Sequence, residues 1–545
     1  MRPLTLAIVV SGAALCAACS KSPEAVPTAV AAAPVTVAAR AEETHDEGIA
    51  WTYAANEAEV DAAFANARAQ NKPVFVYWGA KWCPPCNQVK ATLFNRQDFI
   101  ARSRAFVPVY IDGDSPGAQK LGSRFKVSGY PTMVLFNPQG AEITRLPGEV
   151  EGARYTQLLS LSMSGQRPAK EVLVQALGDP KALAANDWRL LAFYTWDTNE
   201  QQLVPKQRVP ALLKQLADTC PPEPVEIATR LRLMALAAVD AKASAHPDPT
   251  AQAALLALLD TPAASRVHLD LLTNQAPDIV RALSARRSPQ RAALLGAFDT
   301  ALKRFEADTS LSRADRMQAL IAQVDLARID VTKNNSQKPA QASVLPAPLL
   351  ADIRTQVAQA DQQITDGFER QAVITSAAYL LDEAGLGAES DALLQANLAK
   401  SHSPYYLMSE LAGNAKRRGD KPGALRWYRE AFETSEGPAT RLQWGASYVN
   451  ALIELAPQEE APIEKTASRL LDEASRLPDA FYERSGRSLT RVGTRLQEWN
   501  RRGAHAQAIE RLRKQLTGIC AALQDDAPRA RCEQVLSKPG AKASA

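Results

Sequence analysis

The sequence predicts an α/β domain with a central mixed sheet, followed by a large all-helical region. Runs of apolar, β-branched and aromatic residues of strand length are concentrated before about residue 165. Segments after Pro168 instead space their apolar side chains at three and four residues, as amphipathic helices do. The length of 545 residues also exceeds that of one domain. We therefore expect further units beyond the α/β domain.

The first strong strand pattern ends shortly before two closely spaced cysteines. Residues 73–78 form an apolar and aromatic run that is typical of a buried strand. Cys83 and Cys86 follow it and enclose Pro84 and Pro85. Because proline is tolerated in the first turn of a helix, the two prolines predict a helix that begins directly after Cys83. The two thiols then lie one helical turn apart, with Cys83 at the positive end.

This placement predicts dithiol redox chemistry, in which Cys83 is the nucleophile and Cys86 resolves the mixed disulfide. A helix N-terminus, with Lys81 nearby, lowers the pKa of a cysteine from about 8.5 towards neutrality. We therefore expect the Cys83 thiol to be ionised and reachable by solvent. The alternatives are a zinc half-site and an inert structural disulfide. Zinc needs two more ligands, but there is no second C-x-x-C beyond the predicted signal segment and the histidines are scattered, so we expect no metal and no organic cofactor.

Several motifs follow one another in a consistent order around the cysteines. They are a strand at 74–78, Trp82 to Cys86, a strand at 106–112, a helix at 118–125, Val127 to Thr132, a strand at 133–136, a turn at 137–140, a strand at 141–146 and a helix near 151–163. In this order they resemble the thioredoxin-like oxidoreductases over about residues 48–165. The resemblance implies a mixed sheet flanked by helices and protein disulfides as substrates.

The resemblance also implies roles for residues near the cysteines. Pro131 is expected to follow a cis peptide bond and to pack against the two sulfurs. Tyr130 is expected to offer its backbone to an extended substrate strand. Trp82 is expected to shield the cysteine pair. Together with Cys83 and Cys86, these residues form the predicted site.

Two residues of the family pattern are replaced in this chain. Tyr77 stands where a buried aspartate is usual, and Pro108 stands where a lysine faces that aspartate. The proton acceptor for Cys86 must then be water or another group. Pro84 and Pro85 add neither a charge nor a hydrogen-bond donor between the cysteines, which favours a reducing rather than an oxidising pair. The pattern is similar to that of thioredoxin-like domains of bacterial thiol-disulfide interchange proteins.

The N-terminal residues predict a secreted and membrane-anchored chain. Residues 1–19 have a basic start, an apolar stretch and small residues before Cys19. They resemble a bacterial lipoprotein signal peptide in which Cys19 is acylated, with ordinary signal cleavage nearby as the alternative. Residues 20–47 are rich in Pro, Ala, Val and Thr and predict a disordered tether. We expect a periplasmic lipoprotein anchored in the inner or outer membrane.

Three cysteines remain outside the signal segment and the pair. Cys520 and Cys532 lie on either side of a turn-forming segment at 525–528, so a structural disulfide between them is geometrically plausible. Such a bridge stabilises a chain by about 2–4 kcal/mol. Two buried free thiols are the alternative. Cys220 is left as a buried small apolar residue or a reactive thiol.

The domains predicted from these patterns are a thioredoxin-like domain at 48–166 and helical domains at 168–330 and 346–540. A polar stretch at 331–346 separates the two helical domains. The tryptophans of the helical region are either groove anchors for a partner or core residues. They are Trp188, Trp196, Trp427, Trp444 and Trp499.

A repeat is visible in the last third of the chain. Gly385 and Gly419 are 34 residues apart, and so are Pro404 and Pro438. This is the period of the tetratricopeptide repeat, so residues 372–457 resemble two degenerate units of that family. A non-repetitive helical domain is the alternative. Solenoids of such units present long surfaces to peptides or proteins, which predicts partner binding.

Charge excludes one further class of partner. With 63 basic and 59 acidic residues, the net charge of +4 predicts no nucleic-acid surface. We expect a reductase-type thiol-disulfide oxidoreductase that acts on envelope proteins and receives electrons from an upstream membrane donor. The alternative is a non-catalytic, lipid-anchored scaffold whose disulfide stays closed.

Overall fold

A computed structural model describes residues 48–127, 129–146, 151–165, 167–196, 203–239, 248–331 and 345–537. The predicted signal segment 1–19 with Cys19, the predicted tether 20–47 and most of the predicted loop 331–346 lie outside these residues. The described residues all belong to one compact unit.

A five-stranded mixed sheet forms the centre of the α/β domain. Its strands are β1 (Thr52–Tyr53), β2 (Val74–Gly79), β3 (Val107–Asp112), β4 (Thr132–Phe136) and β5 (Glu142–Leu146). They lie in the order β1-β3-β2-β4-β5. Strand β3 runs parallel to β1 and β2, whereas β4 is antiparallel to both β2 and β5. All residues of β2, the central strand, are buried, as its unbroken apolar sequence predicts.

Helices cover both faces of this sheet because the residues of β2 alternate between them. Val74, Val76 and Trp78 pack with α1 (Glu57–Gln70) and α4 (Ala118–Phe125). The intervening side chains, Phe75 and Tyr77, pack on the other face. Their partners there are α2 (Pro84–Val89), η1 (Lys90–Phe94), α3 (Gln97–Ser103) and α5 (Gly152–Gly165).

Beyond α5, all the described secondary-structure elements are helices. The helices are α6 (Ala169–Gly178), η2 (Pro180–Ala182), α7 (Ala185–Ala192), η3 (Lys206–Arg208), α8 (Val209–Thr219), α9 (Val225–Ala237), α10 (Pro249–Asp260), α11 (Pro262–Val267), α12 (Leu269–Asn274), α13 (Ala276–Leu283), α14 (Pro289–Ala307), α15 (Arg313–Ala327), α16 (Ala347–Gln363), α17 (Gly367–Glu383), α18 (Gly387–Asn397), η4 (Leu398–Lys400), α19 (Pro404–Arg417), α20 (Lys421–Thr434), α21 (Pro438–Leu455), α22 (Glu460–Ser475), α23 (Glu483–Trp499), α24 (Ala506–Ala522) and α25 (Asp526–Val535). The predicted fold class, an α/β domain followed by a large helical region, is confirmed.

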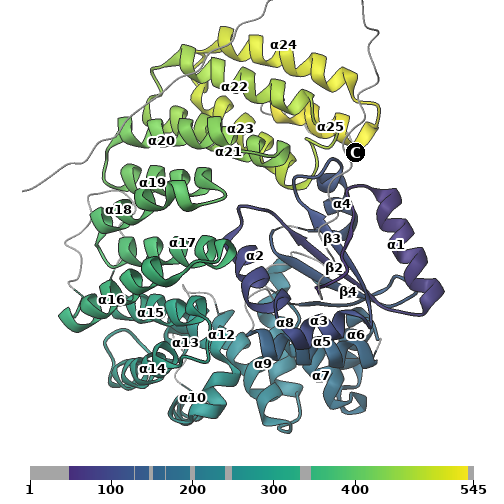
Figure 1. The fold of residues 1–545 in the computed structure, drawn as a ribbon, viewed down its shortest axis with the longest axis vertical. Helices are drawn as coiled ribbons and strands as arrows, with labels where there is room; N and C mark the ends of the chain where they lie inside the picture. Colours follow the sequence, from purple (N-terminus) through teal and green to yellow (C-terminus); the bar gives the residue numbers. More distant parts are fainter. Residues whose placement is uncertain are drawn as a thin grey trace, which may run out of the picture. The chain divides into compact units, whose positions relative to one another are not determined.

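Consecutive helices of the second half pack in pairs. Helix α17 packs on α18, α19 on α20 and α21 on α22 (Figure 1). Gly385 and Gly419 lie in the turns that close the first two pairs, with φ of 84° and 80°. These left-handed values favour glycine, and they end each helix in the same way. Among the described residues, no helix is both long and apolar enough to cross a membrane.

The helical series also packs back onto the α/β domain. Helix α17 packs against α2, and α23 packs against α4 (Figure 1). Helices α6 and α7, which follow the domain directly, pack on β5 and α5. The two cysteines at the start of α2 therefore lie at a junction between the sheet domain and helices that are several hundred residues away in sequence.

Candidate functional site

The two cysteines lie at the start of α2, where the sequence predicts them. Helix α2 begins at Pro84, and Cys83 is its N-cap residue in an extended conformation. The Cys83 sulfur accepts a hydrogen bond from the backbone N–H of Cys86, at 3.2 Å. The two residues form a disulfide, with their Cα atoms 5.2 Å apart. The structure therefore holds the pair in its oxidised form.

Asn87 holds the loop before α2 in place, a role that the sequence analysis did not identify. Its side-chain amide donates to the carbonyl oxygens of Lys81, at 2.9 Å, and Cys83, at 2.8 Å. The side chain is fully buried. These two bonds fix the turn between β2 and α2, and thereby the position of the Cys83 sulfur. A single asparagine after a C-x-x-C motif gives no recognisable sequence signal for this role.

The loop before β4 lies beside the pair. The peptide bond between Tyr130 and Pro131 is cis. The Tyr130 ring lies 6.4 Å from the Trp82 ring, and its hydroxyl accepts a hydrogen bond from the Gln119 side chain at 3.1 Å. Burial raises the pKa of Tyr130 to about 12, so its hydroxyl is protonated at neutral pH. The structure thus brings Trp82, Tyr130 and the cysteines together.

Tyr77 and Pro108 replace the charged pair of the family pattern. Tyr77 lies opposite Tyr110 on β3, with ring centroids 5.0 Å apart, whereas Pro108 lies opposite Phe75. The expectation that Pro108 faces Tyr77 is therefore wrong by two residue pairs along the ladder. Burial, together with Tyr110 and Asp112, raises the pKa of Tyr77 well above its ordinary value. Tyr77 is therefore unsuited to accept a proton from Cys86.

Lys81, which the sequence places near Cys83, has a carboxylate partner. Its ammonium lies 3.0 Å from the Glu436 carboxylate, and both side chains are exposed. A nearby anion offsets part of the stabilisation that Lys81 would give a thiolate. The N-terminal position of Cys83 on α2 is then the main feature that favours its thiolate.

Helices of the second half cover the cysteine pair. The exposed fraction is 2% for Cys83, 0% for Cys86 and 6% for Trp82. The Trp82 ring stacks on Tyr406, at 5.9 Å between centroids and 16° between planes, and meets the edge of Trp444 at 5.0 Å. The expectation that the Cys83 thiol is reachable by solvent is wrong for this structure, because Cys83 is buried in one apolar cluster with residues of α19 and α21.

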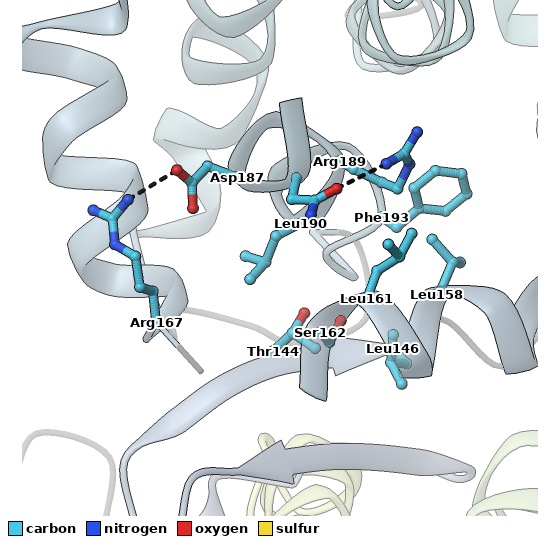
Figure 2. Close-up of a pocket in the computed structure, with 11 residues that line it drawn as sticks. Thr144, Leu146, Leu158, Leu161, Ser162, Arg167, Asp187, Arg189, Leu190 and Phe193 are labelled. Carbon is cyan, nitrogen blue, oxygen red and sulfur yellow. Dashed lines mark hydrogen bonds and ion pairs between the residues drawn. The ribbon is translucent and has the colours of Figure 1, made fainter. Parts of the chain in front are cut away.

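A small hollow elsewhere on the domain does not include the cysteines. It lies between β5, α5 and α7, and it has a volume of about 30 Å³ (Figure 2). Arg167 forms an ion pair with Asp187 at one end, and Arg189 bonds to Asn186 at the other. This volume is about that of one water molecule. The hollow is therefore too small for a substrate.

The other cysteines lie in the helical region. Cys520 on α24 and Cys532 on α25 form a disulfide, with Cα atoms 5.6 Å apart. Cys220 is buried and free, and burial raises the pKa of its thiol to about 11. A thiol with so high a pKa is a poor nucleophile at neutral pH. Cys220 is therefore best described as a small apolar residue of the core.

Comparisons with known proteins match the α/β domain. Residues 60–161 match the model of the thioredoxin-like domain family. A 120-residue segment, 21% of this chain, is 29% identical to 20% of the thiol:disulfide interchange protein DsbD 1 of Pseudomonas aeruginosa. A 112-residue segment is 30% identical to the protein DsbD of Pseudomonas fluorescens, and it covers 20% of this chain and 19% of that protein.

The match is confined to one part of each protein. The chain spans about a fifth of the length of these curated relatives. The solution structure of a thioredoxin from Thermus thermophilus is 26% identical, with a TM-score of 0.20, and it covers 25% of this chain and 98% of that one. The family match and the sheet order together identify residues 60–161 as a thioredoxin-like domain, related to that of DsbD proteins, which carries the Cys83–Cys86 pair.

Proposed function

We propose that this protein is an envelope thiol-disulfide oxidoreductase of the reductase type, which exchanges disulfides with protein substrates through Cys83 and Cys86. The observation that carries the proposal is the pair itself, with Cys83 at the N-cap of α2 in a thioredoxin-like domain. The names of the matched relatives, thiol:disulfide interchange proteins, support the same chemistry.

The reaction follows from the order of the two sulfurs. In the reduced protein, the Cys83 thiolate attacks one sulfur of a substrate disulfide, that bond breaks, and the leaving substrate sulfur takes a proton. Cys86 loses its proton and attacks the Cys83 sulfur, which releases the second substrate thiol. Two electrons pass to the substrate, and the Cys83–Cys86 disulfide forms. An upstream dithiol donor at the membrane then reduces this disulfide.

The reductase direction rests on what lies between the cysteines. Pro84 and Pro85 have no backbone N–H and no charge to stabilise the Cys83 thiolate, and strong oxidants depend on that stabilisation. Equilibration of the protein with glutathione or dithiothreitol buffers measures the reduction potential. We expect a value nearer that of thioredoxin, about −270 mV, than that of strong oxidants, about −120 mV. A value at the oxidising end would reverse the assigned direction.

The rest of the chain is assigned to location and partner binding. We propose that an acylated Cys19 and the segment 20–47 anchor the protein, and that the helical domains at 168–330 and 346–540 bind a partner. The equivalent turns at Gly385 and Gly419 support tetratricopeptide-like units at 372–457. Metabolic labelling with a fatty acid tests the anchor. The wild-type protein should take up the label, and Cys19→Ser should abolish the labelling.

Insulin reduction in the presence of dithiothreitol tests the chemistry. Cys83→Ser should lower the rate to that of dithiothreitol alone, whereas Cys220→Ser should leave it unchanged. Cys86→Ser should accumulate mixed disulfides on Cys83, and mass spectrometry of these identifies the substrates. Equal rates for the wild-type protein and Cys83→Ser would refute the enzymatic proposal.

Burial of the pair favours a second candidate function, a scaffold with a permanently closed disulfide. Cys83 and Cys86 are almost completely covered. A scaffold would give no insulin reduction and no trapped partner with Cys86→Ser. It would still bind its partner when both cysteines are replaced by serine.

A further inference from the structure

We propose that the helical region is an intramolecular cap, which closes over the Cys83 face of the thioredoxin-like domain and must open before a protein substrate reaches the cysteines. The identity of the substrate rests on the proposed function. The cap itself rests on contacts between helices of the second half and the residues that border the cysteine pair.

The cap occupies the surface that a substrate strand would use. Trp82 and Tyr130 border the cysteines, and a single cation from the cap lies over both of their rings. The Arg484 guanidinium is 4.6 Å from the Trp82 ring centroid and 5.1 Å from that of Tyr130. A second contact involves the backbone of Trp82, whose carbonyl oxygen accepts a hydrogen bond from the Gln371 side chain of α17 at 3.3 Å. A protein substrate cannot approach Cys83 while these contacts persist.

A series of hydrogen bonds links the thioredoxin-like domain to the cap at the centre of this interface. The Trp82 indole N–H donates to the Thr440 hydroxyl at 2.7 Å. The Thr440 hydroxyl donates to one oxygen of Asp114 at 2.6 Å, and the Thr440 backbone N–H donates to the other oxygen at 2.7 Å. Thr440 is the third residue of α21, so Asp114 of the thioredoxin-like domain caps the N-terminus of a cap helix.

Gly437 makes room for this contact. It is the N-cap residue of α21, with φ of 88°, and a Cβ atom there would lie 2.5 Å from the Asp114 carboxyl carbon. The backbone conformation and the close approach both require glycine. The start of α21 is thus shaped to receive a side chain from the thioredoxin-like domain.

A second set of contacts joins α4 to the segment before and within α23. The Gln119 backbone N–H donates to the Asp479 carboxylate at 2.7 Å, and the Arg484 backbone N–H donates to the Gln119 side chain at 3.1 Å. The Ser123 hydroxyl donates to the Glu483 carboxylate at 2.8 Å. The cap is therefore held at two places, one beside the cysteines and one on α4.

Aromatic rings form part of the interface, but its polar part is suited to opening. It places charged groups out of water, and burial raises the pKa of Asp114 and lowers that of Arg484. Desolvation of such groups offsets much of the energy of their contacts. In the open form these groups regain water, unlike the apolar residues of a core. The net stability of the closed form is accordingly smaller than its many contacts suggest.

Thiol access in the full-length protein tests the cap. After reduction, Cys83 is labelled with N-ethylmaleimide or with a 5 kDa maleimide-polyethylene glycol, and mass spectrometry measures each rate on the Cys83 peptide. The ratio of the large-probe rate to the small-probe rate reports access, because thiol ionisation affects both rates equally. Thr440→Val removes the hydroxyl that joins Trp82 to Asp114, and it should raise this ratio about tenfold.

Two further variants make the result unambiguous. Thr273→Val removes another buried hydroxyl, which bonds only within α12, and it should leave the ratio unchanged. Glu436→Lys lies at the exposed rim opposite Lys81 and cannot prevent folding. It should raise the ratio about threefold at low salt, and less at high salt. An unchanged ratio in both Thr440→Val and Glu436→Lys would overturn the cap.

Insulin reduction by the same variants separates this proposal from the proposed function. If the ratio rises but no variant reduces insulin above the dithiothreitol background, the cap stands and the oxidoreductase assignment fails. If the wild-type protein reduces insulin and neither variant changes the ratio or the rate, the assignment stands and the cap fails. If the cap and the oxidoreductase assignment are both correct, Thr440→Val should reduce insulin faster than the wild-type protein.

Discussion

The two disulfides that the structure describes are equally buried but differ in what they join and in what covers them. Cys83 and Cys86 lie within one turn of α2, so their bridge closes a segment of only a few residues. Cys520 and Cys532 join α24 to α25 across twelve residues of chain. Because a bridge stabilises a fold by restricting the unfolded chain, the second bridge is placed to add more stability than the first.

The residues that cover the two disulfides also differ. Cys520 and Cys532 belong to an apolar cluster built from neighbouring helices, α21 to α25. Cys83 and Cys86 also belong to an apolar cluster, which includes Tyr405 and Trp444 of the cap. Polar contacts border this cluster, since Thr440 of the cap bonds to Asp114 and Arg484 of the cap lies over Trp82, more than 300 residues away in sequence. Burial alone therefore does not distinguish the two bridges. The chemistry of the cover does, because a polar interface can open to water at a smaller free-energy cost than an apolar core.

Removing the α2 pair should give the largest effect of all the changes. This effect should be on the rate of insulin reduction, and the effect on stability should be small. Cys83→Ser/Cys86→Ser should lower insulin reduction to background, because the attacking and resolving sulfurs are both lost. The free energy of unfolding, from guanidinium titration, should fall by no more than about 2 kcal/mol, because so short a bridge restricts little chain. A loss of several kcal/mol would mean that this bridge is structural.

Removing the C-terminal bridge should give the opposite result. Cys520→Ser/Cys532→Ser should leave insulin reduction intact and lower the stability of α24 and α25 by about 2–4 kcal/mol. Hydrogen exchange of peptides from these helices measures this change. Unchanged hydrogen-exchange protection in α24 and α25 would mean that this bridge is not a stabilising one. A loss of insulin reduction equal to that of the α2 variant would mean that the two bridges do not differ in function.

The α/β domain could be predicted because its signals are local. Pro84 and Pro85 mark the start of α2, and the apolar run of β2 marks the central strand. The helix predicted at 118–125 coincides with α4. The cis bond before Pro131 followed from the family resemblance, since no local pattern specifies it.

The cover could not be predicted because its contacts are not local. Nothing near Thr440 in the sequence indicates that its hydroxyl bonds to Trp82 and Asp114. Helical spacing alone does not decide whether Trp444 is a core residue or a groove anchor, and its ring packs on Trp82 of the other domain. Gly437 gives a weak sequence signal of a helix start, since it directly precedes Pro438, the first residue of α21. Its partner, Asp114, is visible only in three dimensions.

Acidity should strengthen the polar cover of Cys83, with a smaller effect than loss of either bridge. Burial, with a smaller contribution from Asp112, raises the pKa of Asp114 from 3.8 to about 6, although Thr440 and Arg484 lower it. In an open form Asp114 is in water, near its ordinary pKa. The closed form then binds more protons than the open form between about pH 4 and 6, so closure is favoured at low pH and weakens as pH rises through 6.

Hydrogen exchange of the first turns of α21 measures this pH dependence. Protection factors there, already corrected for intrinsic exchange, should fall by about tenfold between pH 5 and pH 7. Asp114→Asn should remove the dependence, and protection in α25 should show none in either protein. A protection factor that rises with pH would contradict the sign of this linkage.

The smallest expected effect lies beneath the pair, on β2. The Tyr77 hydroxyl is fully buried, with no hydrogen-bond partner among the residues that the structure describes. Tyr155 is equally buried, but its hydroxyl donates to the Met133 sulfur at 3.0 Å. Tyr77→Phe should therefore stabilise the protein by about 1 kcal/mol, whereas Tyr155→Phe should destabilise it slightly. Insulin reduction should be unchanged in Tyr77→Phe, because a phenol with so high a pKa cannot accept the Cys86 proton. A slower rate with a normal Cys83 labelling ratio would instead make Tyr77 the group that replaces the missing aspartate.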